Sequence, residues 1–181
     1  MRRFHRRDDL GDQRIFDLCS RPFNSLDDLE TKLIKKWNGK VTANDIVYIL
    51  GDISGEDLKH ALELINSLNG QKHLILGNHD INHIAQIKKS GIFASISTLK
   101  FINDENRKVC LCHYPIMDWS CGSEMIYHVY GHIHNKTIKQ GVLYEEIKNF
   151  YKDKPAFNSS IDMTGFEPVT LNELIILKEG Y

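Results

Sequence analysis

Residue types that bind metals or transfer protons follow four separate apolar runs in this 181-residue sequence. After the run His73–Leu76 an Asn, a His and an Asp stand together, although a simple turn needs none of them. Such a group makes sense where the backbone must present an amide oxygen, an imidazole and a carboxylate to one point. Strand ends in layered α/β domains are where such sites are built. The four groups, in chain order, are Gly51-Asp52, Gly77-Asn78-His79-Asp80, His113 and Gly131-His132-Ile133-His134.

Each of these residues also has a structural explanation that needs no chemistry. Asp52 fits a helix cap or a turn, Asn78 a left-handed turn, and Asp80 the N-cap of a following helix. His132 and His134, however, are two residues apart, so in an extended segment both point to one side. Four such groups, each directly after an apolar run that is expected to form a strand, favour a metal or acid–base site. The other histidines are expected to be ordinary core or surface residues: His5, His60, His73, His83 and His128.

The order of these motifs, GD, GNHD, H and GHxH, resembles the calcineurin-like metallophosphoesterase family. The stretches Arg21-Pro22-Phe23, Trp37-Asn38 and 158–168 resemble its small single-domain bacterial branch, so the resemblance covers nearly the whole chain. It implies a four-layer α/β/β/α sandwich formed by one domain over residues 1–181. It also implies an enzyme that hydrolyses phosphate monoesters or diesters, with a hydroxide held by two divalent metal ions as the nucleophile.

The two-metal chemistry of the family gives each motif an expected role. Two ions about 3.5–4 Å apart cancel the charge of the phosphate, hold the ester in line and lower the pKa of a shared water. The resemblance implies that Asp52 bridges the two ions and that His134 belongs to the first. It implies that the second ion is held, with Asp52, by Asn78, His113 and His132. These ligand types suit Mn, Fe, Zn, Co or Ni.

His79 and Asp80 have a different implied role, because neither is a metal ligand in the family. The resemblance makes His79 the group that stabilises the phosphoryl oxygens or protonates the leaving group, with Asn78 also facing the substrate. Asp80 then orients the imidazole of His79, since a catalytic histidine needs a partner that fixes its tautomer. Tyr114 and Trp119 are candidates to line the substrate mouth, with aromatic packing as their default role.

The N-terminus departs from the family, whose first strand ends in a DxH motif that supplies two ligands of the first ion. Counting back from Arg21-Pro22-Phe23 places Arg7 at the position of the Asp and Asp9 at that of the His. Residues 1–6 also make a poor buried strand, because three of them are Arg. The first strand is therefore expected to be disrupted, and residues 1–9 to be atypical.

Three explanations for the missing motif stay open. In one, the recorded start or reading frame differs from the native one. In another, Asp9, Asp8 or His5 replaces the missing ligands, with Asp9 favoured by its register. In the third, the first ion is lost and the domain is a catalytically weak or inactive binding or scaffold protein. Arg7 argues against simple replacement, because a guanidinium at a ligand position repels a divalent cation.

The elements that must position these motifs alternate between strand and helix in the first half of the chain. Apolar runs at 45–50 and 72–76 enclose a helical pattern that begins near 54–55, which predicts a βαβ unit with parallel strands. A helix capped by Ser25 or Asp27 precedes them. The other expected elements are helices at 11–20, 81–89 and 143–151, strands at 92–96, 99–102, 108–112, 125–130 and 157–163, and a helix or strand at 170–177.

Composition limits the classes of partner. A formal net charge of −1 gives no bulk electrostatic reason to expect nucleic acid or a membrane surface, and no apolar window approaches the ~20 residues of a membrane span. The expected partner is a small phosphate ester, a class that includes nucleotides. The cysteines lack CxxC spacing, which favours reduced thiols in a cytoplasmic protein over a structural zinc site; they are Cys19, Cys110, Cys112 and Cys121.

Overall fold

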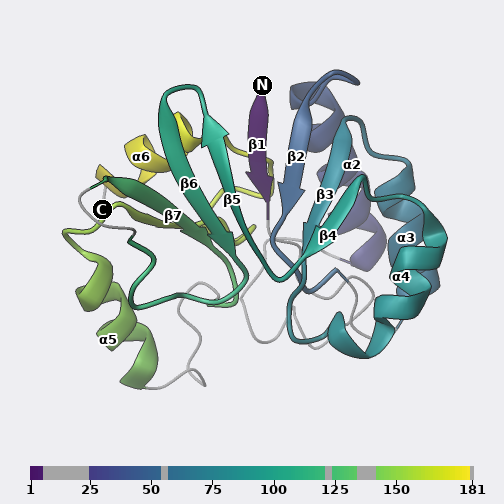
Figure 1. Ribbon diagram of the computed structural model, residues 1–181. Helices are drawn as coiled ribbons and strands as arrows, with labels where there is room; N and C mark the ends of the chain where they lie inside the picture. Colours follow the sequence, from purple (N-terminus) through teal and green to yellow (C-terminus); the bar gives the residue numbers. More distant parts are fainter. Residues whose placement is uncertain (6–24, 54–56, 121–123, 134–141, 180–181) are drawn as a thin grey trace.

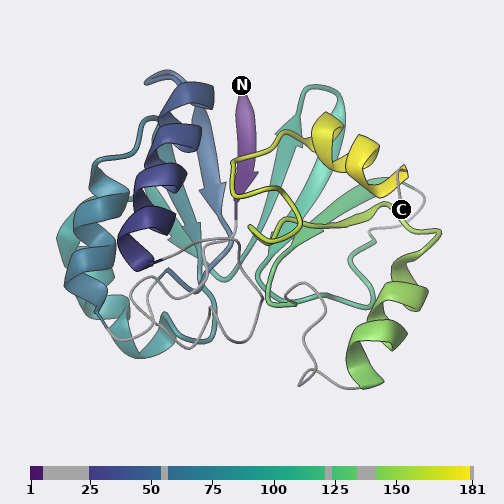
Figure 2. The same ribbon diagram turned by 180° about the vertical axis from the view of Figure 1, so that it is seen from behind.

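Two four-stranded sheets lie face to face in the computed structural model, with helices on their outer sides (Figures 1 and 2). The structure describes residues 1–5, 25–53, 57–120, 124–133 and 142–179. Its layers are helices, first sheet, second sheet and helix, which confirms the predicted four-layer α/β/β/α sandwich. No helix in this described part is long and apolar enough to cross a membrane.

The first sheet is fully parallel and has the strand order β1-β2-β3-β4. Parallel neighbours need crossover connections, and helices supply them here, so the predicted βαβ unit is confirmed. The strands are β1 (Arg2–His5), β2 (Ile46–Ile49), β3 (Gln71–Ile75) and β4 (Ser95–Ser97). The helices are α2 (Leu26–Lys40), α3 (Leu58–Asn66) and α4 (Ile84–Ser90), the last preceded by the 3₁₀ turn η1 (Ile81–His83).

The second sheet is mixed and has the strand order β5-β6-β7-β8. The pair β5–β6 is antiparallel, whereas β6–β7 and β7–β8 are parallel. The strands are β5 (Leu99–Asp104), β6 (Arg107–Cys112), β7 (Ile126–Tyr130) and β8 (Ala156–Asn158). Two helices accompany this sheet: α5 (Val142–Tyr151) and α6 (Leu171–Glu179).

Side chains of β2 alternate between two separate cores, as expected for a strand covered on both faces. Val47 and Ile49 pack against the helices of the first sheet, whereas Tyr48 and Leu50 pack between the two sheets. A third cluster, around Tyr151, packs α5 against the outer face of the second sheet. This alternation fixes the direction of the chain where β2 ends, and so fixes where the residues that follow it lie.

Several predicted boundaries change in the structure. The cap of α3 is Asp57, whose carboxylate accepts a 3.0 Å hydrogen bond from the amide of His60, rather than residues 54–55. The strand expected at 92–96 is limited to β4, because the chain first has to turn after the left-handed C-cap Gly91 of α4. The segment at 170–177 forms helix α6, and the helix expected at 11–20 lies outside the described residues.

The expectation of a disrupted first strand is wrong, since β1 forms and pairs in parallel with β2. Phe4 anchors it: the side chain is fully buried between the sheets, and its backbone exchanges hydrogen bonds of 2.7 and 3.1 Å with Val169. Charged groups in and beside this strand form ion pairs. Arg2 lies 3.7 Å from Asp104, and the terminal amine of Met1 lies 3.0 Å from Asp45.

The charged composition of β1 still has a physical cost. The Nε atoms of Arg2 and Arg3 are buried and find no hydrogen-bond acceptor among the described residues. A buried donor without an acceptor costs about 1–3 kcal/mol. The stability of β1 therefore depends on the burial of Phe4 and on the backbone pairing of the strand. Neither contribution can be judged from the polarity of the side chains alone.

Candidate metal centre

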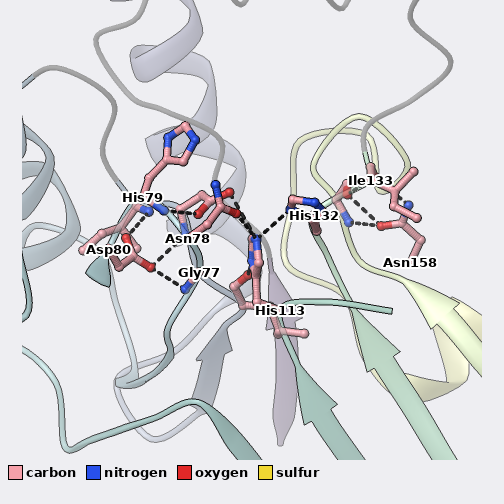
Figure 3. Close-up of polar contacts among 12 residues, drawn as sticks. Gly77, Asn78, His79, Asp80, His113, His132, Ile133 and Asn158 are labelled. Carbon is pink, nitrogen blue, oxygen red and sulfur yellow. Dashed lines mark hydrogen bonds and ion pairs between the residues drawn. The ribbon is translucent and has the colours of Figure 1, made fainter. Parts of the chain in front are cut away.

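Four strands from both sheets end at the same side of the molecule, the lower edge in Figure 1. Asp52 follows β2, Asn78 follows β3, His113 follows β6 and His132 follows β7. Figure 3 shows Asn78, His113 and His132 gathered around one point. The structure thus brings together four of the residues that the sequence singled out.

The Nε2 atom of His113 is the centre of this group. It lies 3.2 Å from Oδ2 of Asp52, 3.1 Å from Oδ1 of Asn78 and 3.2 Å from Nδ1 of His132. The ligand atoms of Asp52, His113 and His132 all lie within 4.8 Å of one another. Asp52 and His113 are buried, and Asn78 and His132 are half-buried, so the group opens to solvent on one side.

The tautomer of His113 determines what this point can hold. Its Nδ1 lies 2.7 Å from the carbonyl oxygen of Leu50, which can only accept, so the Nδ1 proton donates there. In the neutral ring the lone pair of Nε2 then faces the oxygens of Asp52 and Asn78, which also only accept. Lone pairs converging from three sides need a cation between them.

The spacing of these atoms also fits a metal ion. Neighbouring ligands of an octahedral ion with bonds of 2.0–2.1 Å lie roughly 3 Å apart, which is the separation found around His113. A ligating histidine commonly donates its second ring N–H to a carbonyl or carboxylate, as His113 does to Leu50. The donor set therefore fits a divalent cation held by Asp52, Asn78, His113 and His132.

Two glycines allow the ends of β2 and β3 to approach closely. A Cβ at Gly77 would lie 2.2 Å from Oδ1 of Asp52, and one at Gly51 would lie 2.5 Å from the backbone nitrogen of Gly77. Gly51 also has a φ of 82°, in the left-handed region that glycine adopts most readily. No other residue fits either position without moving the Asp52 carboxylate or the turn that faces it.

Asp52 and His132 adopt left-handed backbone conformations themselves, with φ of 51° and 64°. Such values are uncommon for residues other than glycine and persist where the surroundings hold them. Both residues belong to the cluster around His113. The strain therefore lies where it aims two candidate ligands at a common point.

Asp80 ties the ends of β2 and β3 together. Its Oδ2 accepts hydrogen bonds from the amides of Asp52 (2.9 Å) and Gly77 (2.8 Å), and its Oδ1 accepts one from Ile53 (3.0 Å). Burial raises the pKa of the Asp80 carboxyl, while these amides act to lower it. This role was not predicted from the sequence, which assigned Asp80 to orienting the His79 ring or capping the following helix, because two of the three amides belong to the end of a different strand.

The expected dyad of His79 and Asp80 stays a prediction. In Figure 3 the His79 ring points away from the Asp80 carboxylate, and the ring is exposed beside the cluster. The side chain of Asp80 makes no capping hydrogen bond to η1. The amide of His79 donates to Oδ1 of Asp52 at 3.1 Å, which leaves Oδ2 of Asp52 facing His113.

A polar pair from the end of β8 supports the loop that carries His132. The carbonyl oxygen of Ile133 accepts hydrogen bonds of 2.8 Å from both Nδ2 of Asn158 and Oγ of Ser160. Figure 3 shows Asn158 beside this loop. The sequence placed Asn158 in a segment that resembles the family but assigned it no role; a polar Asn-Ser-Ser run directly after a strand was the available signal.

The remaining predicted residues separate into two groups. His134 and Asp9 lie outside the described residues, as do Arg7, Cys19 and Cys121. His128 is the buried core histidine that was expected, with its ring nitrogens bonded to the carbonyl of Cys110 and the amide of Ile116. Cys110 and Cys112 are free and buried, and burial raises the pKa of the Cys110 thiol to about 12.

Comparison with known proteins places this geometry in a family. The family model of the calcineurin-like phosphoesterases matches residues 9–173. The uncharacterized protein MJ1445 of Methanocaldococcus jannaschii is 29% identical over 167 residues, which cover 91% of this chain and 84% of that protein. The gene 66 protein of Mycobacterium phage L5 is 41% identical over 80 residues, which cover 41% of this chain and 37% of the phage protein.

A solved structure shares the fold. The protein of unknown function AQ665 from Aquifex aeolicus superimposes with a TM-score of 0.69 at 19% identity, and the match covers 98% of each chain. The family match extends over most of this chain and includes every strand end that carries a candidate ligand. The chain belongs to the calcineurin-like phosphoesterase family.

Proposed function

We propose that the chain is a metal-dependent hydrolase that cleaves small phosphate monoesters or diesters at a site for two divalent ions. The observation that carries the proposal is the convergence of Asp52, Asn78 and His132 on the Nε2 atom of His113. Bound divalent ions would neutralise the phosphoryl oxygens and lower the pKa of a water at the site. The ligand types suit Mn, Fe, Zn, Co or Ni.

The protein's own residues divide the remaining work. Asp52 is proposed for the bridging position, with its Oδ2 facing His113 and with Asn78, His113 and His132 on the side of the second ion. His134 is proposed for the first ion, together with Asp9 at the altered N-terminus. Asn78 faces the substrate, where its amide can bind a phosphoryl oxygen.

His79 is proposed as the group that acts on the leaving oxygen. Its ring is exposed beside the cluster, so it can reach an ester bound there, while its amide is held by Asp52. A protonated imidazole in that position can give a proton to the departing alkoxide. Asp80 is proposed to act with His79 by holding the turn that presents it.

The natural substrate is proposed to be a small phosphate ester, with nucleotides among the candidates, handled by one domain over residues 1–181. A cytoplasmic location is proposed because the free, buried thiols Cys110 and Cys112 suit a reducing compartment.

The test is hydrolysis of bis(p-nitrophenyl) phosphate with and without added Mn²⁺, with Asp52→Asn purified in parallel. Turnover that depends on Mn²⁺ and falls at least a hundredfold in the variant is the expected result. Calorimetric Mn²⁺ binding by both proteins supplies a readout that does not depend on turnover. Equal, metal-independent rates for the two proteins would overturn the proposal.

A further inference from the structure

An aromatic ring stands uncovered directly against the candidate metal ligands. The ring of Tyr114 meets that of His113 edge to face, with centroids 4.9 Å apart, and lies 4.8 Å from the ring of His132. Tyr114 is nevertheless 41% exposed, whereas Tyr48, Tyr130 and Tyr151 are buried. Single exposed aromatic residues are common, but this one combines an exposed surface with direct ring contacts to two candidate metal ligands, so a molecule bound at the site would meet it.

The loop that carries Tyr114 is held firmly. Two residues further on, the amide of Ile116 donates to Nε2 of His128 at 3.2 Å, and the carbonyl of Ile116 accepts from the hydroxyl of Tyr151 at 2.6 Å. His128 lies on β7 of the second sheet, and Tyr151 is the last residue of α5, which packs against the outer face of that sheet. The exposed ring is therefore anchored through its backbone, and binding against it would cost little ordering.

Trp119, the other aromatic candidate from the sequence, behaves differently. Its indole N–H donates to the carbonyl of Ile126 at 2.7 Å, and its ring packs 5.0 Å from His128 and 5.8 Å from Tyr151. It fills the core under α5. Of the two, Tyr114 alone presents its ring both to solvent and to the candidate ligands.

We infer that Tyr114 determines substrate specificity by stacking its ring on a planar organic group of the ester, an aromatic ring or a nucleobase. The inference rests on the proposed function, because it takes the metal centre as the place where the phosphate binds. An ester whose phosphate sits among Asp52, Asn78 and His113 carries its organic group within reach of the neighbouring ring. Stacking of one base on one aromatic side chain changes affinity by about 5- to 150-fold.

The experiment compares two ligands that differ only in the base. Binding of adenosine 5′-monophosphate and of ribose 5-phosphate is measured by calorimetry in the presence of Mn²⁺, for the wild type, Tyr114→Phe and Tyr114→Leu. We expect the wild type and the Phe variant to prefer the nucleotide at least tenfold. The Leu variant keeps an apolar side chain without a plane, and its preference is expected to fall to within twofold.

Matched controls separate this role from a structural one. Phe101→Leu removes an aromatic side chain that is 53% exposed on β5, away from the metal centre, and should leave the preference unchanged. Mn²⁺ affinity and the thermal midpoint should be equal in all variants. For the hydrolysis of bis(p-nitrophenyl) phosphate, Tyr114→Leu should raise KM and change kcat little.

Several outcomes would overturn the inference. They are equal binding of the two ligands by the wild type, an unchanged preference in Tyr114→Leu, and a lost preference in Tyr114→Phe, which would assign the effect to the hydroxyl. The proposed function is tested separately. A nucleotide preference without Mn²⁺-dependent turnover would support the Tyr114 inference and contradict the enzyme, whereas turnover without a preference would do the reverse.

Discussion

The two walls of the candidate metal centre are held by opposite kinds of backbone group. The first wall, Asp52 and Asn78 at the ends of β2 and β3, presents oxygen ligands and is fixed by backbone N–H donors. The amide of His79 holds Asp52 Oδ1, and Asp80 gathers three further amides beneath it. The second wall presents the imidazoles of His113 and His132 at the ends of β6 and β7.

The imidazole of His113 in the second wall is fixed by a carbonyl oxygen. His113 donates to Leu50 at the end of β2, and His128, in the core behind, donates in the same way to Cys110. The oxygens of the first wall and the Nε2 atom of His113 are thus left facing the centre. An oxygen ligand needs donors behind it and a neutral imidazole needs an acceptor behind it, so substitutions should affect the two walls through different chemistry.

The largest effect is expected from a substitution at Gly77 in the first wall, where there is no space for a side chain. Gly77→Ala places a methyl group 2.2 Å from Oδ1 of Asp52, so the carboxylate or the turn must move. We expect a loss of about 3 kcal/mol or more in unfolding free energy and loss of measurable Mn²⁺ binding. Urea denaturation and calorimetry measure the two.

Gly39→Ala is the matched control for that substitution. Gly39 lies in the last turn of α2, and a Cβ there meets no atom within 4 Å. It should stabilise the protein by roughly 0.5–1 kcal/mol, as expected for alanine in a helix. Wild-type Mn²⁺ affinity in Gly77→Ala would show that the close contact does not position Asp52.

The stability of the protein should fall in acid because of His128, which lies in the core behind the second wall. Burial lowers the pKa of His128 to about 4 in the folded protein, from an ordinary value of 6.5. The unfolded chain therefore binds a proton that the folded one does not, and stability falls as the pH drops from about 6.5 to about 4. The full loss is roughly 3 kcal/mol.

Urea denaturation at pH 7.0 and at pH 4.5 measures this loss, with His128→Gln as the comparison. The variant should lose less stability between the two pH values. Asp45 interferes little, because the amide of Thr42 lowers its pKa from 3.8 to about 2, so the stability it contributes is lost between these values, below pH 4.5. Equal losses in both proteins would assign the acid response to other groups.

A smaller effect is expected at Asp80, which binds amides of the first wall. Asp80→Asn keeps one acceptor oxygen but turns an NH₂ group toward backbone donors. We expect a loss of roughly 2 kcal/mol in stability and a weakening of Mn²⁺ binding by about 10- to 100-fold. Asp45→Asn, which disturbs an amide contact at the opposite end of β2, should lower stability without changing Mn²⁺ affinity.

The sequence predicted which residues gather at the strand ends wherever the information is local. Apolar runs gave the strands, and parallel pairing brought their ends to one edge, so Asp52, Asn78, His113 and His132 could be named from their positions. It could not give the left-handed backbone of Asp52 and His132, because those angles are imposed by contacts between loops. For the same reason the amide contacts of Asp80 and the support from Asn158 became visible only in three dimensions.

The error at β1 has a similar origin. Polarity along residues 1–6 argues against a strand, and that argument omits the backbone of β2 and the partner Val169, which belong to distant parts of the chain. In β1, one buried phenylalanine and two sets of backbone bonds outweigh the two arginines Arg2 and Arg3. The side-chain composition of a short segment is therefore a weak guide to whether it forms a strand, because the backbone that pairs with it belongs to other parts of the chain.

That pairing also bears on how the protein folds. Phe4 and Val169 are far apart in the sequence, so their contact closes a long loop of chain. Until the contact forms, β1 has one open edge that can pair with a strand of another molecule. Contacts between distant segments are typical of slow folding steps, so we expect β1 to complete its pairing late in folding.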